Sequence, residues 1–320
     1  MATITYPRTD QADQVVSGRS PRRKRRQWAP YLFLVIPLAL YFTWIIGPTI
    51  ATGVLSATNW DGVSALHFSD KNGTSYLVQN FQRLFVDSNF WTALSDNIKW
   101  LLFFLIIPTS MGLAMAMIFN GKFRGSRVFK IAFYSPLVLA GVVTGLIWSA
   151  MYNPSSGLIN SFLRIFTGTE SGLPLWLGDR TLALWCIIFA AAWRQVGYVM
   201  ILYLAGLKGL DTTLIEAATV DGATFWERFR FVVFPLLAPV TVVVMVISII
   251  DSLRAFDLVA IMTNGGPDHS SEVLANFMYI SAFNNYKMGY AAAIAVVLFA
   301  LMLCFIIPYL IYTSRTELEY

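Results

Sequence analysis

The stretch that decides the fold of this 320-residue chain is LKGLDTTLIEAATVDGATFWERFRFVVFPLLAP (Leu207–Pro239). Long apolar stretches precede and follow it, while its acidic, basic and Thr residues gather in the middle. A polar segment enclosed in this way is typical of a connection between two membrane-spanning helices. The segment is long enough to hold structure of its own.

Two short helices are expected inside this segment. Asp211 or Thr213 can cap the first one, and Thr213 and Glu216 have the spacing of a capping box. Apolar residues then recur at helical spacing, and the helix is expected to end at Gly222. The second helical turn covers Phe225–Phe231. The sequence therefore predicts a rigid elbow that lies across the cytoplasmic face of a membrane protein.

Apolar stretches of membrane-spanning length occur along the whole chain. A helix needs about 20 mostly apolar residues to cross the hydrocarbon core. Six stretches meet this requirement: Pro30–Leu55, Thr92–Phe119, Phe129–Tyr152, Leu182–Leu207, Val232–Ala260 and Gly289–Tyr312. We therefore expect an all-α membrane protein with six transmembrane helices.

The composition agrees with this fold class and excludes others. Charged residues make up 13% of the chain, hydrophobic residues make up 57%, and the mean hydropathy is +0.61. A soluble protein has about twice that share of charged residues, so an ordinary cytosolic enzyme is excluded. The two cysteines both lie in apolar stretches, which supports neither a disulfide framework nor a metal site.

The distribution of Lys and Arg predicts the orientation. With the N-terminus inside, most of them fall on cytoplasmic segments, including the cluster Arg22–Arg26 directly before the first apolar stretch. The net charge of +5 thus indicates contact with anionic lipid rather than with nucleic acid. Both termini are expected to be cytoplasmic.

This orientation divides the chain into four segments. Residues 1–28 are predicted to be a disordered, basic cytoplasmic tail. Residues 29–91 hold the first transmembrane helix and a folded extracytoplasmic loop. Residues 92–314 form a five-helix core that includes the cytoplasmic loop 208–231, and residues 315–320 form a cytoplasmic tail.

Periodicity alone fits an amphipathic helix that rests on lipid headgroups as well as it fits a docking element. The string EAATVDGA followed by FPLLAP, however, resembles the EAA loop of permeases of binding-protein-dependent ABC importers. The resemblance covers nearly the whole chain. Four further strings are similar to the carbohydrate branch of that family, with its maltose and glycerol-3-phosphate permeases: DGA (Asp221–Ala223), NPSSGLIN (Asn153–Asn160), WLGD (Trp176–Asp179) and MTNGGP (Met262–Pro267). One departure is Asp211, where the family often has Pro.

The resemblance implies the type I ABC importer permease fold, in the bacterial cytoplasmic (inner) membrane, and a mechanism of alternating access. It implies that the EAA loop forms a coupling helix that docks on an ATP-hydrolysing subunit. The implied docking residues are Glu216, Ala217, Ala218, Asp221 and Gly222. The implied partners are a second, homologous permease that completes a heterodimer, two ATP-binding subunits and an extracytoplasmic solute-binding protein.

The sequence agrees that ATP hydrolysis takes place on another chain. It contains no phosphate-binding loop of the form G-x-x-x-x-G-K-[ST], and Asn120-Gly121-Lys122 lacks the spacing and the hydroxyl. His67 and His269 do not belong to a metal or catalytic constellation. We therefore expect a chain without enzymatic activity, cofactor or metal, with ATP and Mg bound by the partner ATPase subunits.

Polar residues inside the predicted spans are the candidates for the translocation pathway or its gate. Asp251, Arg254 and Asp257 are three residues apart, which would place them on one face of the fifth helix. Their alternative role is a salt-bridge ladder that only stabilises this helix. Arg194 and Gln195 lie in the fourth span, where an Arg facing lipid would cost about 3 kcal/mol or more. We expect the Arg194 side chain to face the bundle interior.

Aromatic residues are candidates for stacking against sugar rings, although most are expected to pack in the core or at the membrane interface. These candidates are Trp148, Tyr152, Trp193, Tyr198 and Tyr203. Two alternative functions stay open at this point: a permease of the same type for a non-sugar solute, and a secondary transporter driven by an ion gradient. A membrane-embedded enzyme is not supported, because acids, His residues and metal ligands do not converge at one depth.

Overall fold

The computed structural model describes residues 29–121, 124–168 and 172–317, and every named element in them is helical. The predicted disordered tail, residues 1–28, and the last three residues lie outside the described residues. The α-helices are α1 (Ala29–Tyr41), α2 (Gly47–Leu55), α3 (Tyr76–Val86), α4 (Ser88–Asn120), α5 (Ser126–Val138), α6 (Gly141–Met151), α7 (Leu158–Thr167), α8 (Ala183–Gly209), α9 (Thr212–Val220), α10 (Phe225–Arg228), α11 (Phe234–Leu236), α12 (Ala238–Leu253), α13 (Asp257–Met262), α14 (Leu274–Tyr279) and α15 (Met288–Glu317). Within the described ranges, three π-helical segments adjoin these helices: η1 (Phe42–Ile46), η2 (Phe229–Val233) and η3 (Ile280–Asn284).

The chain divides into two compact units, residues 1–49 and 50–320. The described part of the first unit holds α1, η1 and the start of α2, and its apolar side chains are exposed. Such a surface is expected of a helix whose solvent is lipid. The second unit contains all the other helices and three clusters of buried apolar residues.

The core of the second unit is built on the long helices α4 and α8, which make the most extensive helix pair. They approach closely because Gly112 of α4 lies against α8, where a Cβ atom at this position would be 2.5 Å from Cγ1 of Val199. Small residues permit this kind of backbone approach in membrane proteins. Helix α5 also packs against α8, and α12 packs against both α4 and α8. Helix α15 packs against α12 and α14.

The six predicted spans correspond to helical segments of the structure, but two of them are bent and are not continuous helices. Among the described residues, four helices are long and apolar enough to cross a membrane, and up to six spans result if each of two bent helix pairs counts as one. The third stretch is not one continuous helix, because α5 and α6 meet at 104°. Leu139 and Ala140 adopt extended backbone angles between them, three residues after Pro136. The fifth stretch is bent by 70° between Phe225–Leu236 and Ala238–Met262.

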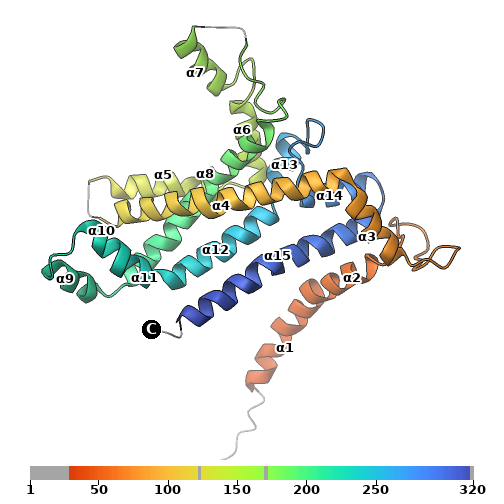
Figure 1. The fold of residues 1–320 in the computed structure, drawn as a ribbon, viewed down its shortest axis with the longest axis horizontal. Coiled ribbons are helices and arrows are strands. Elements are labelled where there is room, and N and C mark those ends of the chain that lie inside the picture. Colours follow the sequence, from red (N-terminus) through yellow and green to blue (C-terminus); the bar gives the residue numbers. More distant parts are fainter. Residues whose placement is uncertain (1–28, 122–123, 169–171, 318–320) are drawn as a thin grey trace, which may run out of the picture. The chain divides into compact units, whose positions relative to one another are not determined.

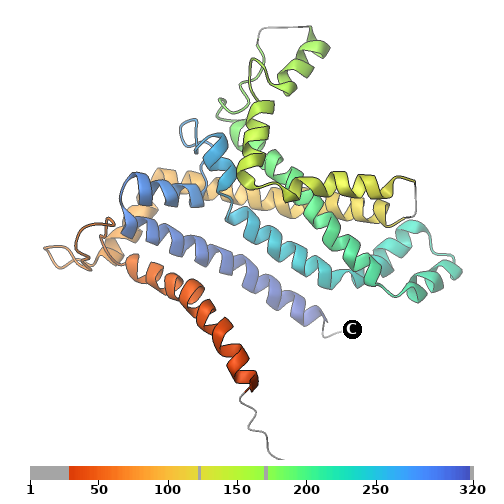
Figure 2. The same ribbon diagram turned by 180° about the vertical axis from the view of Figure 1, so that it is seen from behind.

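The two predicted faces of the protein lie at opposite ends of the second unit. Figure 1 shows α9 and α10 at one end and α3 with its preceding loop at the other, and the reverse view in Figure 2 agrees. The C-terminal end of α15 lies towards the α9 end, whereas α6 and α7 project from the side of the bundle. This arrangement agrees with the expectation that loops 56–91 and 208–231 face opposite sides of the membrane.

Candidate functional site

A cavity of about 670 Å³, here called the central cavity, opens between α4, α5, α8, α12 and α13. All five predicted pathway residues line it: Arg194, Gln195, Asp251, Arg254 and Asp257. Two arginines and two aspartates thus face one space within an otherwise apolar bundle. The sequence prediction placed these residues on two spans, and the structure brings the two groups together.

The charged groups of the central cavity are not arranged as the sequence predicted. Helix α12 ends at Leu253, the chain is non-helical at Arg254–Phe256, and Asp257 begins α13. The expectation that Asp251 and Asp257 share one helix face is therefore wrong. The three residues form no ion pair with one another in the described part of the chain, so the salt-bridge ladder is absent there. The helix break instead points both acids and Arg254 into one cavity.

Asp251 has polar neighbours on two helices. The guanidinium groups of Arg254 and Arg194 and the amide of Gln195 surround its carboxylate. Gln195 is buried and its Nε2 donates a hydrogen bond to Oγ of Ser248, at 3.4 Å. Nε of Arg194 is buried without a hydrogen-bond partner among the described residues. The cavity wall is thus a connected polar surface that keeps at least one hydrogen-bond donor, Nε of Arg194, without a partner among the described residues.

Asp257 is held against a different helix. A Cβ atom at Gly141, the first residue of α6, would lie only 2.6 Å from Oδ2 of Asp257. The carboxylate therefore sits at the N-terminal end of α6, where the helix dipole favours a negative charge. This contact places the bent third span and the fifth span at the same edge of the cavity.

The predicted aromatic residues divide into two groups. Tyr198 lines the central cavity, whereas the others do not. Trp148 packs against Tyr152 and Trp193 with ring centroids 5.4 and 5.9 Å apart, and Tyr152 packs against Trp176 at 6.0 Å. These four residues are called the aromatic cluster here. The hydroxyl of its buried member, Tyr152, donates to the carbonyl of Cys186 at 3.3 Å.

Some aromatic residues of the cavity wall were not singled out from the sequence. Trp100, Phe104 and Phe256 line the central cavity. Trp100 and Phe104 lie one helical turn apart on α4, a spacing that could have indicated a shared face. The candidate Tyr203 is buried elsewhere, and its hydroxyl donates to Oγ1 of Thr241 at 3.2 Å. The sugar-stacking role of every candidate stays a prediction.

The second candidate site, here called the elbow (Thr212–Val233), comprises α9, α10 and η2. Asp211 caps α9 by accepting a hydrogen bond from the backbone N–H of Thr213 at 2.9 Å, and this bond lowers the pKa of the Asp211 carboxyl. The predicted capping box at Thr213 and Glu216 is not formed. A capping box is found instead at α10, between Thr224 and Glu227.

The elbow is tied together by short-range contacts. Nη1 of Arg228 donates to Oγ1 of Thr219 at 2.8 Å, which joins α10 to α9. Ile215 packs with Phe229 in a cluster that also includes residues of α4 and α8. Gly222 has a φ of +84°, a left-handed conformation that other residues adopt only with strain. The turn after α9 therefore depends on this glycine.

The predicted docking residues of the elbow lie at the surface of the chain. Glu216, Ala217, Asp221 and Gly222 are exposed, and Ala218 is half-buried. The helix thus fixes itself to the bundle through Ile215 and leaves its acidic and small residues free. Their docking role itself stays a prediction.

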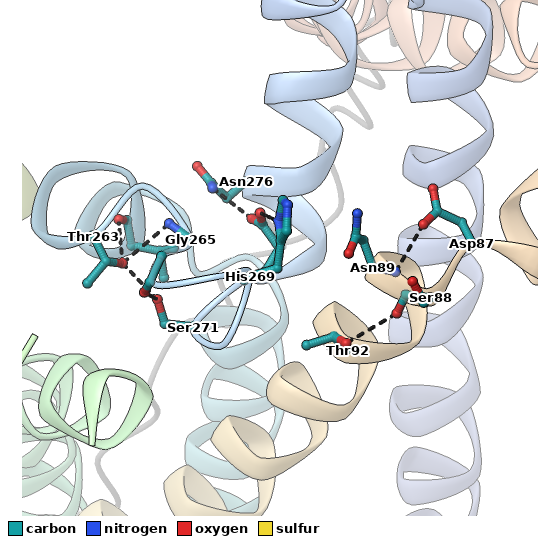
Figure 3. A network of polar contacts seen from close by, with 12 residues as sticks. Asp87, Ser88, Asn89, Thr92, Thr263, Gly265, His269, Ser271 and Asn276 are labelled. Carbon is teal, nitrogen blue, oxygen red and sulfur yellow. Dashed lines mark hydrogen bonds and ion pairs between the residues drawn. The ribbon is translucent and has the colours of Figure 1, made fainter. Parts of the chain in front are cut away.

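The loop between α13 and α14 forms a dense polar network at the opposite end of the unit from the elbow (Figure 3). Glu272 is fully buried and accepts hydrogen bonds from Asn276 Nδ2 at 2.7 Å and His269 Nδ1 at 3.1 Å. The hydroxyls of Thr263 and Ser271 lie 2.8 Å apart. This network includes Thr263, Gly265 and Gly266 of the MTNGGP string and ties together the loop that follows the fifth span.

Comparison with known proteins identifies the family. Residues 27–317 match the model of the binding-protein-dependent transport system inner membrane component. A probable ABC transporter permease of Pyrococcus horikoshii is 34% identical over 291 residues, which cover 90% of this chain and 97% of the relative. The trehalose/maltose transport system permease protein of Thermococcus litoralis is 32% identical, over 73% of this chain and 78% of the relative.

A solved structure has the same fold. A chain of a bacterial ABC transporter involved in the import of the acidic polysaccharide alginate superimposes with a TM-score of 0.77 at 19% identity, over 91% of this chain and 96% of that chain. This likeness confirms the predicted permease fold, and the apolar helices agree with several passages through the membrane. The chain accordingly belongs to the family of inner membrane components of binding-protein-dependent transport systems.

Proposed function

We propose that this chain is the transmembrane subunit that forms half of the translocation pathway for a sugar or related carbohydrate. The observation that carries the proposal is the central cavity, in which charged and amide groups gather beside Trp100 and Tyr198. Amides and charged groups can bind hydroxyls, and aromatic rings can stack on sugar faces. Relatives named for the transport of trehalose and maltose, starch degradation products and multiple sugars support the carbohydrate class.

The cavity also supports a two-permease assembly. Asp251, Arg254 and Asp257 are exposed along the open side of the cavity in this single chain. Charges cannot face lipid without a large cost in free energy. A second, homologous permease that covers this side would complete the pathway and shield the charges. A solute-binding protein would deliver the carbohydrate at the end of the molecule that carries α3.

The elbow supports coupling to ATP hydrolysis on other subunits. Its exposed residues Glu216, Ala217 and Asp221 offer a carboxylate-rich, closely approachable surface. Two ATP-binding subunits, which would hold ATP and Mg, would each dock on the elbow of one permease. When nucleotide binding closes the pair of ATPase subunits, the closed pair would bind one orientation of the cavity more tightly than the other. The permease would therefore shift towards that orientation. In this arrangement both termini and the elbow face the cytoplasm, and this chain makes and breaks no covalent bond.

The proposal is tested by reconstituting this permease with its partner permease and ATPase chains in liposomes. Uptake of a panel of labelled mono-, di- and oligosaccharides is measured with the binding protein, in the presence of ATP or of an imposed ion gradient. We expect uptake that requires both ATP and the binding protein and that is specific for a carbohydrate. Uptake that continues without ATP and follows the ion gradient would contradict the proposal, as would a strict preference for a non-sugar solute.

A further inference from the structure

A second cavity, here called the α3 pocket, lies at the end of the molecule opposite the elbow and has a volume of about 330 Å³. Three segments far apart in the sequence form it: residues 59–60, helix α3, and residues 286–290 at the start of α15. Its lining contains Arg83 and Lys287, three amide side chains and aromatic rings, but no acidic residue. The pocket is separate from the central cavity and has no part in the pathway described above.

The walls of the α3 pocket are held by hydrogen bonds. Nδ2 of the buried Asn80 donates to the carbonyls of Ser56 and Thr58, at 3.0 and 2.9 Å. The backbone N–H of Gly289 donates to the carbonyl of Trp60 at 2.9 Å. These bonds fasten α3 and the start of α15 to the same loop. The pocket is therefore a preformed feature of the fold, and binding there would not have to order its walls.

Its two cations have no anionic partner. In the ranges that the structure describes, Arg83 and Lys287 form no ion pair. The guanidinium of Arg83 lies over the ring of Tyr290, 5.2 Å from its centroid, and this contact leaves the charge uncompensated. The nearest acid behind that ring, Asp87, accepts the hydroxyl of Tyr290 and caps α4 through Asn89 N–H. A carboxylate that enters the pocket would meet both cations.

Two other basic residues at this side of the membrane are already engaged, whereas Lys71 lies on an exposed turn outside the pocket. Arg180 forms an ion pair with Asp268, and Arg164 donates to the carbonyls of Pro154 and Ser155. Lys and Arg are scarce on the outer segments of this sequence, as the positive-inside rule requires. Two uncompensated cations in one pocket of that side are therefore a distinct electrostatic feature.

The surroundings of the pocket resemble the rim of a protein interface. The same loop exposes Val63 and Phe68 by 91% and 54%, and Tyr286, which lines the pocket, is 66% exposed. Tyr286 also has a φ of +53°, which is uncommon for a residue other than glycine. Exposed apolar and aromatic residues around a charged pocket are typical of a site where one partner side chain inserts.

We infer that the α3 pocket receives an acidic side chain of the solute-binding protein and so fixes that protein on the outer end of the permease. The inference rests on the proposed function, because it needs a binding protein that docks at this end. The Asp or Glu of the partner would pair with Arg83 and Lys287, while its neighbours would pack on Val63 and Tyr286. Charge pairs of this kind set both the register and the rate of association.

The test measures the affinity of the binding protein for the complete transporter in nanodiscs. Arg83→Gln, Lys287→Gln and the double variant are compared with Lys71→Gln, a control that removes a cation from an exposed turn of the same loop. We expect the double variant to lower the affinity about tenfold or more, whereas the control changes it about twofold at most. Lys287→Gln keeps the test decisive, because the Lys287 side chain forms no hydrogen bond or ion pair within the described residues, so its replacement should not disturb folding.

A photoreactive cross-linker at position 286 then identifies the partner surface. We expect it to label a segment of the binding protein that contains an Asp or Glu. We also expect that an acidic residue at position 83 or 287, combined with a basic residue in place of that Asp or Glu, restores the affinity. Equal affinities in all variants, with normal ATPase stimulation, would overturn the assignment of the pocket alone. A binding protein that fails to stimulate the unsubstituted complex would refute the proposed function instead.

One further experiment distinguishes a carboxylate of the binding protein from a carboxylate of a small solute. Binding of radiolabelled glucuronate and of radiolabelled glucose to the complete transporter is measured in the absence of binding protein. We expect neither sugar to bind in the α3 pocket. Binding of glucuronate that the double variant loses would assign the pocket to a small acidic solute and overturn the inference.

Discussion

The elbow and the central cavity differ in how far apart in the sequence their residues lie. In the elbow, each stabilising hydrogen bond joins residues within nine positions, as Arg228 and Thr219 do. In the cavity, the neighbours of Asp251 include Arg194, on another helix and more than fifty positions away. The elbow is therefore a local structure that holds its own shape, whereas the cavity wall exists only when the helices are packed.

The comparison predicts separable defects. Changes in the elbow should disconnect ATP hydrolysis from transport without disturbing the cavity. Changes in the cavity should impair transport while the docking of the ATPase stays intact. The following variants test this separation, in order of decreasing expected effect.

Substitutions at the docking surface should have the largest effect. Glu216→Arg reverses an exposed charge of α9, and Gly222→Val forces a β-branched residue to φ of +84°. We expect transport and stimulated ATPase activity to fall by about a hundredfold or more, because like charges brought together at an interface cost several kcal/mol. Membrane insertion should not change, and a protease-protection assay measures it. Normal coupling in Glu216→Arg, with Thr212→Ser as the matched control, would refute the docking role of α9.

Removal of Arg194 should impair transport by about tenfold or more, because Asp251 would lose a compensating cation in a poorly solvated wall. The variant is Arg194→Leu, and initial uptake rates are measured together with co-purification of the ATPase. Co-purification should be normal. The neighbouring variant Trp193→Leu, whose ring packs in the aromatic cluster, should have a much smaller effect on uptake. Loss of ATPase binding in Arg194→Leu would show that the two regions are not separable.

Tyr198 should matter more for the solute than the aromatic cluster does. Tyr198→Leu removes a ring that lines the central cavity. We expect it to raise the apparent KM for the solute about threefold to tenfold, since an aromatic contact is worth about 1 kcal/mol. Trp148→Leu should instead lower thermal stability with little change in KM. An equal rise in KM for both variants would place the aromatic cluster in the pathway.

The smallest effect is expected at the capping box of the elbow. Thr224→Ala should destabilise α10 locally by about 1 kcal/mol, because it removes the hydroxyl that accepts the N–H of Glu227. Thr213→Ala, at the capping box that the sequence favours and the structure lacks, should change stability by less than about 0.5 kcal/mol. Amide hydrogen exchange over residues 225–233 measures the difference. Faster exchange in the Thr213 variant alone would contradict the observed caps.

The sequence predicted the features that depend on short-range patterns. Helix α9, its end near Gly222 and the second turn of the elbow followed from caps and apolar spacing, although the capping box belongs to Thr224 and not to Thr213. The apolar stretches followed from length and composition. These features need only the chemistry of neighbouring residues, and for that reason a single sequence is sufficient to predict them.

The features that depend on tertiary packing could not be predicted in the same way. The 104° bend between α5 and α6 and the helix break at Arg254 both interrupt apolar segments that read as continuous. The contact of Asp257 with the start of α6 and the meeting of Asp251 with Arg194 cross between spans. The five polar residues predicted for the pathway thus line one cavity, as expected of a shared polar set, while their geometry required the fold and their pathway role stays a prediction.

The charge balance of the cavity wall has a consequence for energetics across the membrane. Two arginines and two aspartates sum to no net charge. Moving one elementary charge through a potential of 100 mV costs or releases about 2.3 kcal/mol. If such a wall changes its orientation, the work done on its positive charges by the membrane potential is nearly cancelled by the work done on its negative charges. The membrane potential would therefore do little work on these four side chains if the wall changes its orientation.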